Sequence, residues 1–255
     1  MGAWPMHDAT SATIHDVSGR NHDGAQTGGV ANLIGGTWGK CLDSSTDTDV
    51  EVPNSTDLSI GDSGTDHPFT LMLLMKVNSN GSFYQLLSKS NGGTREWEFF
   101  INSSGNVLQF LLFESSSDVT RIGRTSSSDP LSLGDWHTVF VTYDGSASAS
   151  GIKQWVDGVQ VDASDSNSGI YTGSGNKSVS IGIGHRASGA PLDGEIANTV
   201  LWNRELDPSS IRLLSHNPYL MYQEPDLMEW LGGTIGGGGT SIPVFINHFK
   251  NQGQL

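Results

Sequence analysis

Two carboxylates separated by one residue are the most suggestive chemical feature of the chain. Glu96 and Glu98 flank Trp97 in an apolar stretch, and alternate residues of a strand point to the same face. Such a pair could act as acid and nucleophile in retaining glycoside hydrolysis. Because no further acidic residue accompanies the pair, the sequence favours a solvated strand face and a protein that is not an enzyme.

The acidic residues concentrate toward the N-terminal end. The chain has 27 Asp and Glu against 13 Lys and Arg, a formal net charge of −14. Residues 1–70 carry ten of the acidic side chains, and oxygen-rich loops of this kind suit a hard cation such as Ca²⁺. The candidate ligands are Asp16, Asp47 and Asp49. No EF-hand pattern is present, so acidity that only keeps the surface soluble is the favoured alternative.

The charge balance also excludes classes of partner. Nucleic acids and anionic membranes attract clusters of Lys and Arg, so neither is expected to bind, and no apolar run approaches the roughly 18 residues that span a bilayer. The N-terminal residues show no signal-peptide pattern. A single cysteine, Cys41, excludes an internal disulfide and a cysteine-based zinc site. His137 lies in an apolar stretch without a recognisable nucleophile motif, so we expect it to be structural.

Carbohydrate binding would need aromatic side chains exposed beside polar groups. Four aromatic residues lie near expected loops and are the candidates: Trp38, Tyr84, Trp97 and Tyr171. Four other tryptophans lie inside strand-like stretches and are expected in the core: Trp4, Trp136, Trp155 and Trp202.

The hydrophobic pattern predicts an all-β, two-sheet antiparallel sandwich with one short helix. Strands are expected at 49–52, 69–75, 97–101, 107–113, 136–143, 153–156 and 179–183. Asp157-Gly158 between two apolar pairs predicts a tight hairpin, because both residues tolerate positive φ. Asp207-Pro208 before Ile211 and Leu214 predicts a capped helix that docks on the sandwich.

We expect two parts, a sandwich over residues 1–222 and a C-terminal arm over 223–255. The arm combines a glycine-rich linker with a short uncharged apolar segment, which predicts attachment to a neighbour. The candidate assembly residues are Trp230, Ile242, Val244, Phe245, Ile246 and Phe249.

Several ordered blocks resemble a known family. They are Asp16 to Gly24, Gly39 to Leu42 followed by Asp49 to Pro53, Phe69 to Leu71, Leu87 to Lys89, Trp136 to Gly145 with Trp155 to Gly158, and Gly194 to Leu206. Together they resemble the laminin-G-like branch of the concanavalin A-like lectin/glucanase superfamily. The resemblance implies a jelly-roll sandwich, and Ala197 and Asn198 replace the acidic pair that would imply a calcium ion there.

The segment 217–225 and the tail also look like extensions found in bacteriophage structural proteins. This second resemblance implies a non-catalytic virion-surface protein, made in the host cytoplasm, that decorates a capsid or mediates adhesion as a homo-oligomer or with other virion proteins. The alternative hypothesis is an extracellular, calcium-assisted lectin-like module that binds cell-surface glycans. The superfamily resemblance also implies a remote alternative, a glucanase that would use Glu96 and Glu98.

Overall fold

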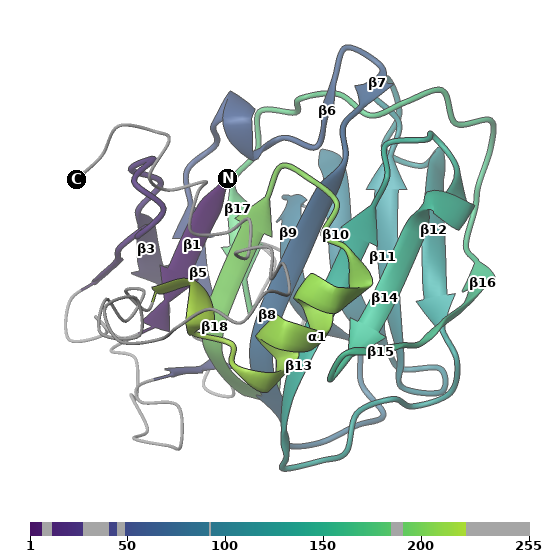
Figure 1. Cartoon of the computed structure of the whole chain (residues 1–255). Coiled ribbons are helices and arrows are strands. Elements are labelled where there is room, and N and C mark those ends of the chain that lie inside the picture. The colour runs from purple at the N-terminus through teal and green to yellow at the C-terminus, as the bar shows by residue number, and fades with distance from the viewer. Residues whose placement is uncertain (7–11, 28–40, 45–48, 92, 185–190, 223–255) are drawn as a thin grey trace, which may run out of the picture.

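The protein is described from a computed structural model covering residues 1–6, 12–27, 41–44, 49–91, 93–184 and 191–222. Within these residues two antiparallel sheets face each other, and a smaller hairpin lies at one end (Figure 1). The predicted all-β sandwich with one short helix is confirmed.

The first sheet has seven strands. Its order is β1 (Gly2–Pro5), β18 (Gly194–Trp202), β8 (Phe69–Val77), β13 (Trp136–Tyr143), β14 (Ile152–Val156) and β15 (Val159–Gln160), with β4 (Leu42–Asp43) also paired to β18. The central strand β8 is buried at eight of its nine positions, as its unbroken apolar run predicts. The turn between β14 and β15 has Asp157 at φ 50° and Gly158 at φ 80°, which confirms the predicted hairpin.

The second sheet has nine strands. Its order is β16 (Asp162–Asp165), β12 (Arg121–Ser126), β11 (Val107–Phe113), β10 (Arg95–Asn102), β9 (Tyr84–Ser90), β17 (Ile181–Ile183), β5 (Asp49–Val52), β3 (Gly24–Thr27) and β2 (Thr13–Ile14). Side chains from both sheets meet in one large core, with Phe110 packed against Phe69, Trp97 and Phe99. This core makes the two sheets a rigid base for the loops at their ends.

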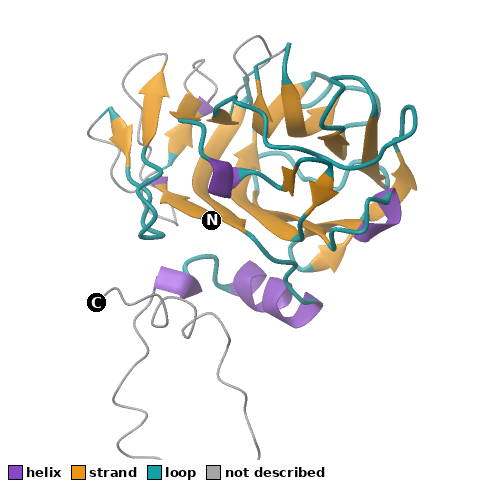
Figure 2. Cartoon of the chain, turned by 90° about the horizontal axis from the view of Figure 1, so that it is seen from above, coloured by secondary structure: helices purple, strands orange, loops and turns teal. Residues whose placement is uncertain are grey.

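A second apolar cluster lies on the outer face of the seven-stranded sheet. Helix α1 (Pro208–His216) lies along this face of the sandwich (Figure 2). Its side chains Ile211 and Leu214 pack against residues including Trp155 and Trp202. The carboxylate of Asp207 accepts hydrogen bonds from the backbone N–H groups of Ser209 and Ser210, so the predicted cap is confirmed. Among the described residues no helix has the length and apolarity needed to cross a membrane.

The segment after α1 is tied to strand β18 where the register shifts between Ile196 and Asn198. Asn198 donates from its side-chain nitrogen to the carbonyl of Pro218 at 3.1 Å and accepts from the hydroxyl of Tyr222 at 2.9 Å. The short 3-10 helix η5 (Leu220–Tyr222) therefore rests on the sheet, at a position where the family resemblance would place an acidic residue.

Four further short elements are a two-stranded hairpin and two 3-10 helices. The hairpin consists of β6 (Gly61–Asp62) and β7 (Thr65–Asp66), and two 3-10 helices, η3 (Thr56–Leu58) and η4 (Ala149–Gly151), lie in loops. The arm over 223–255 lies outside the described residues, and with it all six assembly candidates: Trp230, Ile242, Val244, Phe245, Ile246 and Phe249. Attachment through this arm stays a prediction.

Candidate functional site

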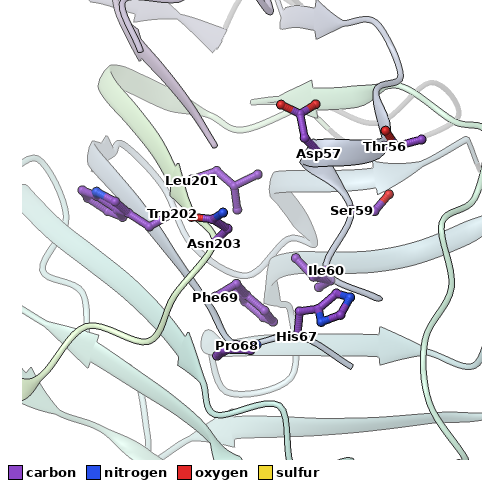
Figure 3. A pocket seen from close by; sticks show the side chains of 10 residues that line it. All are labelled: Thr56, Asp57, Ser59, Ile60, His67, Pro68, Phe69, Leu201, Trp202 and Asn203. Carbon is purple, nitrogen blue, oxygen red and sulfur yellow. The ribbon is translucent and has the colours of Figure 1, made fainter. Parts of the chain in front are cut away.

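A cavity of about 340 Å³ opens where three segments meet at one end of the sandwich (Figure 3). Its lining comes from η3 and the residues after it, from the start of β8, and from the end of β18: Thr56, Asp57, Ser59, Ile60, His67, Pro68, Phe69, Leu201, Trp202 and Asn203. Small-molecule pockets in proteins have volumes of about 300–1,000 Å³, so the cavity has the size of a small ligand site.

The cavity has an apolar floor and a polar rim. Ile60, Phe69 and Leu201 are almost fully buried and lie beneath the cavity as part of the core, and the exposed ring of Pro68 adds apolar surface above them, whereas His67 and Asn203 are exposed at the rim. Figure 3 shows the imidazole of His67 beside Ile60 and Phe69. A ligand in this cavity would therefore meet an apolar surface below and hydrogen-bonding groups around its edge.

The hairpin β6–β7 positions His67. Its turn has Ser63 at φ 50° and Gly64 at φ 89°, the conformation of a tight two-residue hairpin turn. The buried carboxylate of Asp66 then fixes the end of the hairpin, because it accepts hydrogen bonds from the hydroxyl groups of Tyr143 and Tyr171 and from the backbone N–H of Ser174. His67 follows directly on this anchored residue.

The connection between β18 and α1 positions Asn203. The hydroxyl of Thr70 donates to the carbonyl of Arg204 at 2.9 Å and accepts from the N–H of Leu206 at 2.9 Å. This clamp joins the connection to strand β8 immediately after Asn203, so the side-chain amide has a fixed base on the opposite side of the cavity from η3.

Asp57 belongs to the rim but is already engaged. Its carboxylate accepts a hydrogen bond from Ser55 and lies 2.8 Å from Nε2 of His22, and it points away from the other lining side chains (Figure 3). Burial by itself would raise the pKa of Asp57, but the hydrogen bonds from Ser55 and His22 hold it below its ordinary value. His67 and Asn203 are therefore the rim groups best placed to contact a ligand.

The predicted carboxylate pair is corrected by the structure. Glu96 lies at an irregularity of β10 and reaches Lys89, whereas Glu98 accepts a hydrogen bond from Ser90 at 2.8 Å. Lys89 and Ser90 are neighbours on β9 and point to opposite faces, so Glu96 and Glu98 do the same. Both glutamates are also buried, at 0% and 3% exposed, so the prediction of one solvated face was wrong.

Two of the predicted glycan-binding aromatics lie in the core. Trp97 is fully buried and packs against Phe110 with ring centroids 6.5 Å apart, and Tyr84 is 7% exposed with its hydroxyl 2.6 Å from that of Ser79. Neither offers an open face to a sugar, because both face the opposite sheet. Tyr171 is half-buried and bonds to Asp66, which makes it a support of the hairpin, and Trp38 lies outside the described residues.

The structure describes two of the three calcium candidates. Asp16 accepts hydrogen bonds from the N–H groups of Ala3, Ser18 and His22, so its carboxylate braces the N-terminal loop. Asp49 begins strand β5, and Asp47 lies outside the described residues. Within the described part of the chain no three His, Cys, Asp or Glu side chains are grouped so that they could hold a metal ion.

His137 belongs to a chain of polar contacts that resembles a catalytic triad. Its Nδ1 lies 2.7 Å from Asp157, and its Nε2 lies 3.0 Å from the hydroxyl of Ser132. However, the backbone N–H of Ser132 donates to Nε2 at 3.1 Å, and the Ser132 hydroxyl donates to Asp135 at 2.7 Å. Because the acceptor site on the imidazole and the serine proton are both engaged elsewhere, this arrangement is a clasp between β13 and its loops.

Sequence reasoning missed the cavity residues. Asp57 and His67 lie close together in the sequence, but Asn203 lies more than 130 positions further along the chain. Asn203 belongs to the block Gly194 to Leu206 that carries the family resemblance, and that block gave no sign of a binding role for it. The available signal was weak: Asp57 follows the predicted strand 49–52 and His67 precedes the predicted strand 69–75, at strand ends where loop residues of a sandwich gather.

Comparisons with known proteins agree with this architecture. The family model for the concanavalin A-like lectin/glucanases superfamily matches residues 44–212. A search of curated proteins finds no match.

Solved structures with a similar fold include three sugar-related proteins. A sialidase of Trypanosoma rangeli has a TM-score of 0.57 at 18% identity, with 86% of this chain and 32% of that chain covered. A botulinum neurotoxin type C structure, described as dependent on two ganglioside molecules for cell entry, gives 0.61 at 19% identity, covering 85% and 50%. Domain 4 of the arabinanase AbnA from Geobacillus stearothermophilus, in complex with arabinotriose, gives 0.55 at 15% identity, covering 84% and 97%. The chain thus spans about a third of the sialidase and half of the toxin chain, and these identities show a shared fold alone.

Proposed function

Because the chain belongs to the concanavalin A-like lectin/glucanase superfamily, we propose that it is a carbohydrate-binding module whose sugar occupies the cavity between His67 and Asn203. The observation that carries the proposal is the combination of an apolar floor and a polar rim. Sugars present both an apolar ring face and hydroxyl groups, so they need this combination.

The solved structures of similar fold support a carbohydrate as the ligand. One is described in complex with arabinotriose, another is a toxin whose cell entry is described as dependent on interaction with two ganglioside molecules, and a third is a sialidase. This support favours the lectin-like alternative over the virion-surface hypothesis, which rested on the arm and on the resemblance of the tail. Binding to viral proteins, an oligomeric state and calcium assistance stay predictions.

We further propose that the module binds without hydrolysing its sugar. Glu96, the first member of the predicted pair, forms an ion pair with Lys89 at 2.6 Å and is fully buried. Glu98 lies on the opposite face, so the two carboxylates cannot flank one glycosidic bond as retaining hydrolysis requires.

A glycan array followed by titration of the strongest hit tests the proposal. His67→Ala and Asn203→Ala each remove one hydrogen-bonding side chain, which corresponds to a loss of roughly 1 kcal/mol or about five- to tenfold in affinity. The matched controls are His216→Ala, at the exposed end of α1, and Asn80→Ala, on an exposed loop, and both should bind as the unaltered protein does. Equal affinity of all four variants would show that the cavity is not the binding site. If the unaltered protein binds no glycan on the array, the proposal of carbohydrate binding fails.

A further inference from the structure

The polar groups behind one wall of the cavity form a closed network. Lys89 and Glu96 are both fully buried, and Nζ of Lys89 lies 2.6 Å from Oε2 of Glu96. Burial raises the pKa of Glu96 and lowers that of Lys89, while the attraction between the two charges opposes both shifts. Neither side chain touches the cavity itself.

The network reaches two cavity residues directly. Lys89 donates from Nζ to the hydroxyl of Ser59 at 2.6 Å, and the backbone N–H of Ile60 donates to Oε1 of Glu96 at 3.0 Å. Ser59 and Ile60 both line the cavity. The wall formed by these two residues, residues 59–60, is therefore bound to the second sheet through side chains of β9 and β10.

A second loop is tied to the same carboxylate. The backbone N–H of Lys177 donates to Oε2 of Glu96 at 3.0 Å, and the hydroxyl of Ser59 donates to Oδ1 of Asn176 at 2.8 Å. Glu96 thus joins two segments that are otherwise far apart in the sequence, and one of them is the 59–60 wall.

Stability alone gives little reason for such a pair. Two charges lose their hydration on burial, and well-packed apolar residues of similar volume often give an equally stable or more stable fold. What apolar residues cannot provide is an acceptor for the N–H of Ile60 and a donor for the hydroxyl of Ser59.

We propose that Lys89 and Glu96 are positioning residues for the cavity. The N–H of His67 donates to the carbonyl of Ile60 at 3.0 Å, so the pair holds the 59–60 wall, and His67 with it, at the distance from Asn203 that a bound sugar requires. This inference rests on the proposed function, because it assigns the wall a place in the sugar site. A structural expectation follows separately. Loss of the Glu96 oxygen that accepts from the N–H of Ile60 should loosen the 59–60 wall and leave the sandwich folded.

Two double variants separate positioning from folding. Lys89→Met with Glu96→Leu removes both charges and the acceptor, whereas Lys89→Met with Glu96→Gln removes both charges but keeps an oxygen for the N–H of Ile60. Hydrogen–deuterium exchange of the Ile60 amide reports on the wall, and thermal unfolding reports on the sandwich. The Leu variant should exchange at Ile60 about tenfold faster, as expected for one lost hydrogen bond, and the Gln variant should restore slow exchange.

Binding of the glycan selected on the array is the second measurement. The Leu variant should bind about tenfold more weakly, and the Gln variant within about threefold of the unaltered protein, at melting temperatures that differ little between the two. The control pair is Arg124→Met with Asp162→Leu, which breaks a partly buried ion pair between β12 and β16 that contributes nothing to the cavity lining. It should leave both the Ile60 exchange and the affinity unchanged.

Each outcome decides one of the two claims. Equal Ile60 exchange in the Leu variant and the unaltered protein would overturn the positioning role. Faster exchange with unchanged affinity would also overturn it, since the wall would then be irrelevant to the sugar. If no glycan binds the unaltered protein, the proposed function fails, and the positioning role for a sugar fails with it. Hydrogen–deuterium exchange of the Ile60 amide would still show whether Lys89 and Glu96 fix the 59–60 wall, independently of any sugar.

Discussion

The cap of helix α1 provides the most quantitative test of the described packing. Asp207→Ala removes a carboxylate that accepts hydrogen bonds from the N–H of Ser209 at 2.9 Å and of Ser210 at 3.0 Å. Loss of an N-cap side chain costs about 1 kcal/mol, and in a domain of this size about 1 kcal/mol corresponds to a melting temperature about 2–4 °C lower. The same helix covers Trp202, whose neighbour Asn203 lines the cavity.

The stability provided by this cap should depend on pH, because the pKa of Asp207 is lowered in the folded protein. Hydrogen bonds from Ser209 and Ser210 lower the pKa of Asp207 to about 2. A carboxyl whose folded pKa lies below its unfolded value contributes stability above the unfolded value, near 3.9, and loses it as the pH falls through the folded value. Asp207 is exposed, so solvent screens its charge. We therefore expect its contribution to stability to stay near the roughly 1 kcal/mol of the cap, below the free energy that the whole pKa shift would correspond to.

Thermal unfolding of the two proteins, followed by circular dichroism from pH 7 to pH 2, measures both effects. The melting temperatures should differ at pH 7 and converge as the pH falls from about 4 toward 2. Glu205→Ala is the control, since its ion pair with Lys153 spans 3.3 Å at the surface and contributes little. An Asp207→Ala variant with the same melting temperature as the Glu205→Ala control would refute this reasoning. So would a difference in melting temperature between Asp207→Ala and the unaltered protein that stays the same down to pH 2.

Three further predictions concern the sandwich. Phe110→Ala should lower the free energy of unfolding in urea by about 3–5 kcal/mol, because the ring packs against three others in the core, and a loss below about 1 kcal/mol would contradict that packing. Tyr171→Phe removes a hydroxyl that donates to the Asp66 carboxylate at 2.9 Å, so unfolding free energy should fall by about 1.5–3 kcal/mol, whereas an unchanged midpoint would show that the bond contributes nothing. Asp157→Asn removes the charge beside His137 and should cost about 1–2 kcal/mol in the same assay, and an equally stable variant would argue against the clasp.

Local patterns predicted the architecture well. Strands over 107–113 and 136–143 have the predicted bounds, and the cap at Asp207 forms as expected. These features depend on residues adjacent in sequence, where alternation, turn chemistry and caps act directly. The tight turn at Asp157 and Gly158 is the clearest case.

The predictions from sequence failed where one extra residue interrupts the alternation of side chains along a strand, and where segments distant in the sequence meet. The irregularity of β10 at Glu96 reverses the face of a side chain, and no simple pattern announces it. Trp97 lies beside that irregularity and was expected near a loop, yet it faces the core. The cavity combines His67 with Asn203 through pairing of β8 with β18, a contact that single-sequence periodicity cannot specify.

The most direct test of the central claim is a crystal structure of the protein with the oligosaccharide selected on the glycan array. We expect one sugar ring in the cavity, with its ring face toward the apolar lining around Pro68 and its hydroxyl groups within hydrogen-bonding distance of His67 and Asn203. An oligosaccharide bound at another surface, with the cavity left to solvent, would contradict it.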